Sequence, residues 1–364
     1  MGAASSTANP ATTSASMNPF WAASQWYFQA NNDQILNGSA QLTTSQQSFS
    51  INLDSNGWLR KFRCVVRSSG AVGGTPAADG PWNVFQNTSF QAPNGNQFFK
   101  THNGWQYLNY KAFGRPWEGD PTRNYDYAKS INPSFTFDVA PEVRNTFGAL
   151  QNQDDRRQYK VQGSIGTIAN VISGTVSTAP TLTFAAGIET WGAPDAMTLT
   201  KQPNQQSPNG ATAQTWRQLS SLPLNGAGAT NTLDARSITG NLNRLWMLEV
   251  RDSNNARQDY LTDPITWTQD NKTLAIFTQA DLFAQFQDFY GDDVMSRPVG
   301  MYIFPRFLNF GAMVGQGWEP TNGATKVQWQ TTTSSTATNV PGTVNILSEQ
   351  IVPIQGVSAD YLNI

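Results

Sequence analysis

The residues able to support nucleophilic or metal chemistry are few in this chain of 364 residues. It contains a single histidine, His102, and a single cysteine, Cys64. A Ser-His-Asp or Cys-His arrangement would have to use His102, and a zinc site needs several His or Cys ligands. Cys64 shares the apolar side of an alternating segment with Phe62 and Val66, so we expect a small core residue rather than a reactive thiol. We expect His102 to lie in a surface loop, and we expect no catalytic residue, no cofactor and no bound metal.

Two carboxylates among aromatic residues are the remaining chemical candidates. Glu118 and Asp120 lie in a stretch rich in aromatic side chains, which are Trp105, Tyr107, Tyr110, Phe113 and Trp117. A pair of carboxylates can hydrolyse a glycosidic bond, and exposed aromatic rings would suit a sugar-binding platform. Aromatic residues are also typical of packed loops and of the cores of subunit contacts. We favour a packed loop or a subunit contact, and two alternatives stay open: a lectin-like spike or tail binding protein, and a β-sandwich carbohydrate-active enzyme.

The charge of the chain bears on its partners. Charged residues make up 13% of the sequence and the net charge is −2, whereas the usual charged share is about 25%. A nucleic-acid binder should show a basic patch or stripe, and we find none, so we expect no direct nucleic-acid binding. A weakly charged surface suits packing against copies of the same chain, because fewer ions lose their water. A single cysteine permits no intrachain disulfide, which favours synthesis in a reducing cytoplasm.

The N-terminal region, residues 1–44, is predicted to be an arm with one short helix. Small polar residues dominate the first 16 positions, and such residues bury too little surface to fix a structure. Asn18-Pro19 suits a helix start, and apolar side chains at helical spacing predict a helix over 19–30. The candidate arm contacts are its aromatic residues Phe20, Trp21, Tyr27 and Phe28. We expect them to pack on the same domain, on a neighbouring subunit or on a lipid surface. We recognise neither a signal peptide nor a membrane span.

From about residue 45 the hydrophobic period changes to two, which predicts half-buried antiparallel strands. After the turn pair Asn56-Gly57, apolar residues at 62, 64 and 66 face one side and basic residues at 61, 63 and 67 face the other. Further strands are predicted at 81–85, 97–99, 134–139, 159–161, 181–184, 245–250, 264–267, 274–277, 301–304, 326–330, 344–347 and around 351. Many short strands joined by polar, Gly-rich turns predict a sandwich or a barrel.

One helix is predicted in the second half of the chain. Thr278 and Asp281 resemble a capping box with Asp in place of the usual Glu, and apolar residues recur after them at helical spacing. This pattern predicts a helix over 279–290 that ends at Gly291. The stretch 100–130 is aromatic but irregular, so we predict no matching helix in the first half.

An internal repeat links the two halves. The core-facing residues of one strand in each half lie 184 positions apart, so that Phe62, Cys64 and Val66 match Trp246, Leu248 and Val250. Arg67 and Arg251 keep the same separation, while Pro81 and Pro264 lie 183 positions apart. A repeat of half the chain is far too long for a solenoid. It fits two whole sandwich domains of about eight strands each, as in a jelly roll.

This organisation resembles a known family. An arm and helix precede two repeated sandwiches, each has a strand like Trp58–Ser69 followed by a Pro81-like segment, and the second holds the helix 279–290. Over roughly residues 18–364 the chain is similar to the double jelly-roll major capsid proteins of the tectivirus–adenovirus lineage. The resemblance implies an all-β fold of two tandem jelly rolls, with an N-terminal helix and one helix inserted in the second half. The domains would be an arm (1–44), a first jelly roll (45–190) and a second (191–364).

The resemblance also implies a function and partners. The chain would be a viral coat protein that is not an enzyme, and its trimers would form the pseudo-hexagonal capsomers of an icosahedral shell. Its partners would be its own copies, neighbouring capsomers, minor capsid proteins and an internal lipid membrane. Its location would be the virion, after synthesis in the host cytoplasm. The family has no catalytic signature, so no functional residue is transferred to this chain.

Overall fold

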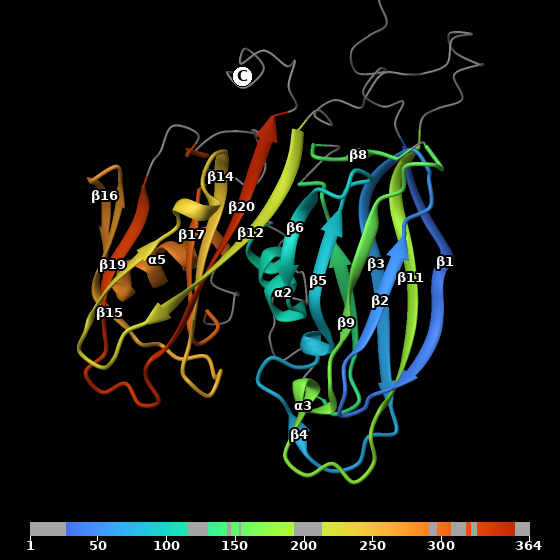
Figure 1. Cartoon of the computed structure of the whole chain (residues 1–364), viewed down its shortest axis with the longest axis horizontal. Coiled ribbons are helices and arrows are strands. Elements are labelled where there is room, and N and C mark those ends of the chain that lie inside the picture. The colour runs from blue at the N-terminus through green and yellow to red at the C-terminus, as the bar shows by residue number, and fades with distance from the viewer. Residues whose placement is uncertain are drawn as a thin grey trace, which may run out of the picture.

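The computed structural model describes residues 27–114, 130–143, 147–152, 154–192, 213–290, 297–306, 318–321 and 326–353. They form two β-sandwiches side by side along the longest axis of the molecule, the first in blue to green and the second in yellow to red (Figure 1). Buried and less buried residues alternate along strands such as Thr181–Gly192, because one face of each sheet packs inward. The all-β, two-sandwich architecture expected from the sequence is confirmed.

The first sandwich packs two sets of four strands face to face. One set has the order β1-β11-β3-β7 and the other the order β6-β5-β9-β2. The strands are β1 (Tyr27–Gln41), β2 (Gln47–Asn52), β3 (Trp58–Ser69), β5 (Phe85–Gln91), β6 (Gln97–His102), β7 (Ser134–Val139), β9 (Lys160–Ile165) and β11 (Thr181–Gly192). Their inward side chains share one apolar core, which includes Phe62, Cys64, Val66 and Phe90.

The second sandwich is built in the same way. Its two sets have the orders β17-β14-β20-β12 and β13-β19-β15-β16. The strands are β12 (Ala213–Leu224), β13 (Thr230–Asp234), β14 (Leu242–Arg251), β15 (Leu261–Gln269), β16 (Lys272–Phe277), β17 (Met301–Pro305), β19 (Val327–Thr333) and β20 (Gly342–Pro353). A separate core includes Trp246, Leu248, Val250 and Trp329.

Strand for strand, the two sandwiches follow one plan. Among these strands, the first, eighth, third and sixth of each half share one sheet, and the fifth, fourth, seventh and second share the other. A helix follows the fifth strand in both halves: α2 (Gly104–Phe113) in the first and α5 (Gln279–Tyr290) in the second. The repeated strand order agrees with the duplication inferred from the sequence.

The two sandwiches are joined through one continuous sheet. Strand β6 of the first lies parallel to β12 of the second, where Phe99 is paired with Arg217. The combined sheet has nine strands, eight of them in the order β17-β14-β20-β12-β6-β5-β9-β2. Helix α2 lies at this join, and helix α5 lies in the second sandwich (Figure 1). The rings of Phe286 and Tyr290 in α5 contact Phe113 of α2.

Short elements complete the described chain. Strands β4 (Thr75–Pro76) and β10 (Ile172–Ser173) pair with each other, β8 (Leu150–Gln151) pairs with β3, and β18 (Glu319–Pro320) pairs with β14. The remaining helical turns are η1 (Trp82–Val84), α3 (Ile168–Val171) and η3 (Arg236–Ile238).

The predicted N-terminal helix is wrong where the structure describes it. Residues 27–30 open β1 and pair with β11, from Tyr27 opposite Gly192 to Ala30 opposite Glu189. Strand β11 pairs with β3 on one side, and β1 satisfies the backbone groups on its other side. Of the candidate arm contacts, Tyr27 and Phe28 therefore belong to β1, whereas Phe20 and Trp21 lie outside the described residues. The arm was predicted over residues 1–44, and most of its described residues belong to β1 of the first sandwich.

Two further expectations about elements need correction. The stretch 100–130 contains a helix, α2, whose first turn is capped by Asn103 and Gln106. Nearly every residue of α2 is buried, so it lacks the polar face that reveals a helix in a sequence. The predicted strand 81–85 is largely the turn η1, and β5 begins at Phe85. The predicted helix over 279–290 is confirmed as α5.

Candidate functional site: the interface between the two sandwiches

Helix α2 is the main contact between the two halves. It starts two residues after β6 and lies between the sandwiches (Figure 1). Its Tyr110 hydroxyl lies within hydrogen-bonding distance of the backbone oxygens of Gln218 in β12 and Ser348 in β20, at 3.2 Å from each. The first sandwich contributes α2, β6 and the loop 77–81, and the second contributes β12, β14 and β20. We call the contact between these two sets the interdomain interface.

The middle of the interdomain interface is apolar. Side chains of α2 share a core cluster with residues of the second sandwich, and the cluster comprises Tyr110, Ala112, Phe113, Leu245, Met247, Phe286, Tyr290, Met301, Ile303 and Leu347. Leu245 and Met247 lie on the side of β14 opposite to Trp246 and Leu248, so β14 is buried on both faces. Burying such side chains stabilises the pairing of the halves by about 1.5–3 kcal/mol for each large residue.

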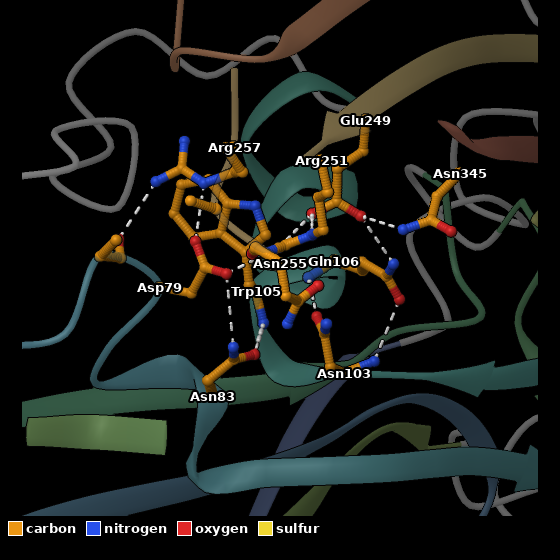
Figure 2. A network of polar contacts seen from close by, with 12 residues as sticks. Asp79, Asn83, Asn103, Trp105, Gln106, Glu249, Arg251, Asn255, Arg257 and Asn345 are labelled. Carbon is orange, nitrogen blue, oxygen red and sulfur yellow. Dashed lines mark hydrogen bonds and ion pairs between the residues drawn. The ribbon is translucent and has the colours of Figure 1, made fainter. Parts of the chain in front are cut away.

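One end of the interdomain interface is a buried network of charges (Figure 2). Arg251 of β14 binds Glu249 on the same strand at 2.5 Å and Asp79 of the first sandwich at 2.6 Å. Burial alone would lower the pKa of Arg251, but the carboxylates of Glu249 and Asp79 outweigh this effect and raise it. A buried guanidinium with two carboxylate partners is therefore held in its charged state.

Arg257 attaches the same loop of the first sandwich from a second direction. Its Nε donates to Asp79 at 2.6 Å, and its guanidinium lies 4.1 Å from the ring centre of Trp105 in α2. It also donates to the backbone oxygen of Ala78 at 3.1 Å. Asp79 thus binds two arginines of the second sandwich, as Figure 2 shows.

Amide side chains complete the coordination of Glu249, which has no exposed surface. Gln106 of α2 and Asn345 of β20 each donate a hydrogen bond to the same carboxylate oxygen at 2.9 Å. The carboxylate thus has partners from both sandwiches. Because a buried carboxylate is costly unless it is paired and hydrogen-bonded, the network fixes the relative position of the halves.

A second charged cluster lies where β6 meets β12. Glu349 of β20 binds Arg217 at 3.0 Å and Arg244 at 2.5 Å, and all three residues are buried. The Arg217 guanidinium lies 4.5 Å from the ring centre of Phe99 and 4.7 Å from that of Tyr110. The same arginine therefore links the carboxylate to both β6 and α2 of the first sandwich.

His102 is not a surface loop residue, so that expectation is wrong. It ends β6 and is 1% exposed, with ring contacts to Tyr107 and Tyr110. Its Nδ1 hydrogen-bonds to the backbone oxygen of Lys100, and its Nε2 lies 3.3 Å from the Tyr110 hydroxyl. Burial lowers the pKa of His102 to about 4, so the ring is neutral at pH 7.

The other sequence candidates divide between cores and undescribed segments. Cys64 is buried as expected, and burial raises the pKa of its thiol to about 12. The aromatic residues proposed as a sugar platform are buried where they are described, namely Trp105, Tyr107, Tyr110 and Phe113. Trp117, Glu118 and Asp120 lie outside the described residues.

The repeat residues lie at matching places in the two cores. Phe62, Cys64 and Val66 belong to the first core, and Trp246, Leu248 and Val250 belong to the second. In both halves they sit on the third strand, between the sixth and the eighth. Arg67 is exposed, whereas Arg251 is buried in the interdomain interface.

The described residues were also inspected for other kinds of site. They contain no group of three His, Cys, Asp or Glu residues placed to hold a metal ion, and none of their helices has the length and apolarity to cross a bilayer. A shallow depression on the first sandwich is lined by Gln46, Ser48, Phe49, Ser50, Asn87, Gln162, Gly163 and Ser164, with no carboxylate among them.

The charged residues of the interdomain interface were not identified from the sequence as a site. The available signal was the presence of Glu249 and Arg251 inside an otherwise apolar strand. Their partner Asp79 is 170 or more residues away in a Gly/Ala-rich loop, and nothing in the sequence pairs it with them.

Comparison with known proteins supports the fold. No protein-family model and no curated protein sequence matches the chain. Among solved structures, the major capsid protein (MCP) of STIV matches with a TM-score of 0.59 and 14% identity, covering 90% of this chain and 97% of that one. PBCV-1 VP54 matches with a TM-score of 0.61 and 12% identity, covering 90% and 94%. The major capsid protein P2 of bacteriophage PM2 matches with a TM-score of 0.52 and 11% identity, covering 90% and 97%. The fold is that of the double jelly-roll proteins.

Proposed function

We propose that this chain is the major coat protein of an icosahedral virus and that it trimerises into pseudo-hexagonal capsomers. One observation carries the proposal: the double jelly-roll fold matches STIV MCP and the PM2 major capsid protein over 97% of their lengths. Function is not implied by fold alone, so the proposal needs its own test.

The interdomain interface supports a structural role. Two sandwiches joined by a buried apolar cluster and two buried charge clusters form one rigid block. A shell requires building blocks that keep their shape, because small errors in angle accumulate around a closed surface. The interface thus gives the pair of sandwiches the fixed geometry that tiling demands.

The finer parts of the proposal follow from the resemblance. The partners are copies of the chain, neighbouring capsomers, minor capsid proteins and an internal lipid membrane, and the chain is made in the host cytoplasm before it enters the virion. We retain a division into an arm, a first jelly roll and a second one that starts near residue 191. The separate apolar cores of the two sandwiches support that division, and we move the start of the first jelly roll to Tyr27, where β1 begins.

Neither alternative function gains support from the described residues. A lectin-like platform requires exposed aromatic rings, yet Trp105, Tyr107, Tyr110 and Phe113 are buried. The carbohydrate-active enzyme rested on Glu118 and Asp120, which the structure does not describe. We propose no enzymatic activity, in line with the structural neighbours, which include the major capsid proteins of STIV and bacteriophage PM2.

Negative-stain electron microscopy of the purified chain tests the proposal. We expect flat triangular or hexagonal particles with the mass of three 39.9 kDa chains, about 120 kDa, together with larger curved assemblies. A preparation that contains only single chains at all concentrations and salt conditions would contradict the proposed function.

A further inference from the structure

A short strand pairs with the third strand of each sandwich, and the two copies of this arrangement differ in chemistry. In the first sandwich, β8 pairs with β3 and places Leu150 opposite Leu59. In the second, β18 pairs with β14 and places Glu319 opposite Asn243. Leu59 and Asn243 are 184 positions apart, which is the separation of the sequence repeat. The same place in the fold therefore holds two leucines in one half and a carboxyl group with an amide in the other.

All four of these side chains are buried. Leu59 and Leu150 belong to the apolar core of the first sandwich, so a sandwich of this plan does not need polar groups there. Asn243 is completely buried, and Glu319 is 7% exposed. Burying a carboxyl group and an amide costs free energy unless their polar atoms have partners. The polar pair of the second sandwich therefore needs an explanation other than the stability of the fold.

The carboxyl group of Glu319 has one hydrogen-bond partner within the described ranges. The indole N–H of Trp246 donates a hydrogen bond to its Oε2 at 2.7 Å. Its Oε1 is buried without a partner, and so are both the amide oxygen and the amide nitrogen of Asn243. Glu349 of the nearby strand β20 is a contrasting buried carboxylate, since it forms ion pairs with two arginines. The part of the chain that the structure describes offers Glu319 no such ion pair.

The charge that acts on Glu319 is that of Arg306, which follows β17. Its guanidinium lies 3.7 Å from the ring centre of Trp267, and its Nε is buried without a hydrogen-bond partner. Burial raises the pKa of Glu319, and the hydrogen bond from Trp246 and the charge of Arg306 only partly oppose this effect. The remaining arginine of this region, Arg244 in β14, binds Glu349 instead.

The other side chains that face Glu319 carry no charge. Strands β14, β15, β19 and β20 present buried amide and indole groups to this end of the second sandwich, namely Asn243, Trp246, Trp267, Trp329 and Gln350. The protonation state of Glu319 therefore depends on its burial, on the Trp246 hydrogen bond and on Arg306 alone among the described residues.

A proton on Glu319 accounts for the unpartnered oxygens. An ionised carboxylate and an amide oxygen both accept hydrogen bonds, whereas a protonated carboxyl group also has an O–H donor. Directly opposed residues of antiparallel strands have Cβ atoms about 4.5–5.5 Å apart, so this O–H can reach the amide oxygen of Asn243. An ionised Glu319 would instead attract the amide nitrogen of Asn243 or the guanidinium of Arg306 to Oε1, and the structure shows neither contact.

The segment that carries Glu319 also contacts the first sandwich. Trp318 is 9% exposed, and its ring centre lies 5.6 Å from that of Phe147. Both rings share an apolar cluster with Ile351 of β20. Strand β18 has only the two residues Glu319 and Pro320, fewer than the usual length of about 3–10 residues. So short a strand depends on its side chains for attachment.

We propose that Glu319 is a pH-sensitive switch: the protonated side chain holds β18 on β14 through Trp246 and Asn243, and its ionisation releases β18 and Trp318 from the join between the sandwiches. Because burial raises the pKa of Glu319 above the ordinary value of 4.5, its contribution to stability is complete below that value. The contribution is lost as the pH rises through the higher value of the folded state. The switch goes beyond the proposed coat function and does not require it.

The substitution Glu319→Gln tests the proposal, because glutamine keeps the shape and a donor for Asn243 but cannot ionise. Urea denaturation of the full chain is measured from about pH 4 to about pH 8. We expect wild type and variant to have the same midpoint urea concentration at the lower pH, and the variant to have the higher midpoint at the upper pH. An equal dependence on pH in the two proteins, or a wild type that is more stable at about pH 8, would overturn the proposal.

The matched control is Glu349→Gln, at a buried carboxylate that is ionised and paired with Arg217 and Arg244. Removing its charge leaves two buried arginines without their partner, so the urea midpoint at about pH 8 should fall. The two substitutions should thus act in opposite directions. If both lower the midpoint, Glu319 is an ordinary ionised carboxylate and the switch does not exist.

A double variant, Asn243→Leu with Glu319→Leu, decides the matter if Glu319→Gln misfolds. It copies Leu59 and Leu150 of the first sandwich, where this pair is compatible with the fold. We expect its stability to fall less than that of wild type between about pH 4 and about pH 8. A double variant that keeps the full pH dependence of wild type would contradict the assignment to Glu319.

Nuclear magnetic resonance of a chain labelled with ¹⁵N-tryptophan gives a readout that a purely structural role would not change. The indole signals of Trp246 and Trp318 are assigned by replacing each residue with phenylalanine. In wild type, we expect both signals to shift with pH over one common range, because Trp246 binds Glu319 and Trp318 precedes it. Both should be constant in Glu319→Gln. Signals that do not respond to pH in wild type would exclude the switch.

Discussion

At the scale of single residues, the pairing of the two halves depends on a few buried charges. Glu249 and Arg251 are both buried, and they meet Asp79 from a loop of the other sandwich. Such ion pairs add modest stability when complete, since desolvation offsets their attraction, but removing one partner leaves an uncompensated buried charge. Their value here is to specify one arrangement of the sandwiches.

Replacing Arg251 by alanine should therefore destabilise the protein strongly. Asp79 would retain Arg257, but Glu249 would lose Arg251, which is its one charged partner among the described residues. We expect the free energy of unfolding to fall by about 3–5 kcal/mol, measured by urea denaturation. The matched control is Arg236→Ala, whose exposed pair with Asp234 should contribute at most about 1 kcal/mol. Equal effects of the two substitutions would show that the buried network does not hold the halves together.

His102 should make stability depend on pH in a defined window. Burial depresses its pKa to about 4 in the folded protein, whereas an unfolded histidine has a pKa of about 6.5. Between these values the unfolded state binds the extra proton, so stability falls as the pH is lowered from about 6.5 towards 4. The loss attributable to His102 should approach 3 kcal/mol, at about 1.36 kcal/mol per pKa unit.

The chain has one histidine, so replacing it isolates the contribution of histidine to the pH dependence of stability. Urea denaturation of wild type and His102→Gln at several pH values between 4 and 7 gives the difference directly. The variant should be less dependent on pH across this window, because glutamine does not titrate. The same slope in both proteins would mean that His102 is accessible to protons in the folded state.

At the scale of elements, sequence patterns were reliable where a strand or helix has one solvent-exposed face. Strand β3 and helix α5 have such faces, and both were predicted close to their observed limits. Helix α2 was missed because it is surrounded by protein and shows no polar side. Strand β1 was predicted as a helix over residues 27–30, since a spacing of aromatic residues cannot reveal the open edge of β11 with which it pairs.

The candidate site was largely beyond sequence analysis for the same reason. The interdomain interface joins residues such as Asp79 and Arg251, whose proximity is a product of the tertiary fold. What the sequence did provide was the duplication, through Phe62, Cys64 and Val66 and their counterparts in β14. That inference required only inward and outward positions, which a strand fixes by its period of two.

The caps of α2 and α5 offer a test at this scale. Asn103→Ala removes the acceptor for the Gln106 backbone N–H, and loss of such a cap costs about 1 kcal/mol. Because α2 also supports the interdomain interface through Gln106, we expect the midpoint temperature of thermal unfolding to fall. Asn103→Ser, which keeps an acceptor oxygen, should restore most of the loss. No difference between alanine and serine would show that the cap has no role in stability.

At the scale of the whole molecule, the two sandwiches act as one block. The interdomain interface combines an apolar middle with two buried clusters of charges. Because one covalent chain supplies both sides of this interface, the contact does not depend on protein concentration. The proposed assembly can therefore form from folded chains without rearranging either sandwich.

The N-terminal arm should act at a later stage of assembly. Since β1 begins at Tyr27, a deletion of residues 1–26 leaves every described strand intact. We expect the shortened chain to fold and form trimers but to close shells poorly, as judged by electron microscopy. If the shortened chain fails to fold, the arm belongs to the first sandwich and not to the contacts between copies.

A cryo-electron microscopy map of the purified oligomer tests the central claim most directly. We predict a ring of six lobes from three chains, in which each chain supplies two lobes, one for each of its sandwiches. A two-fold particle in which like sandwiches face each other, or a chain that stays single, would contradict the account.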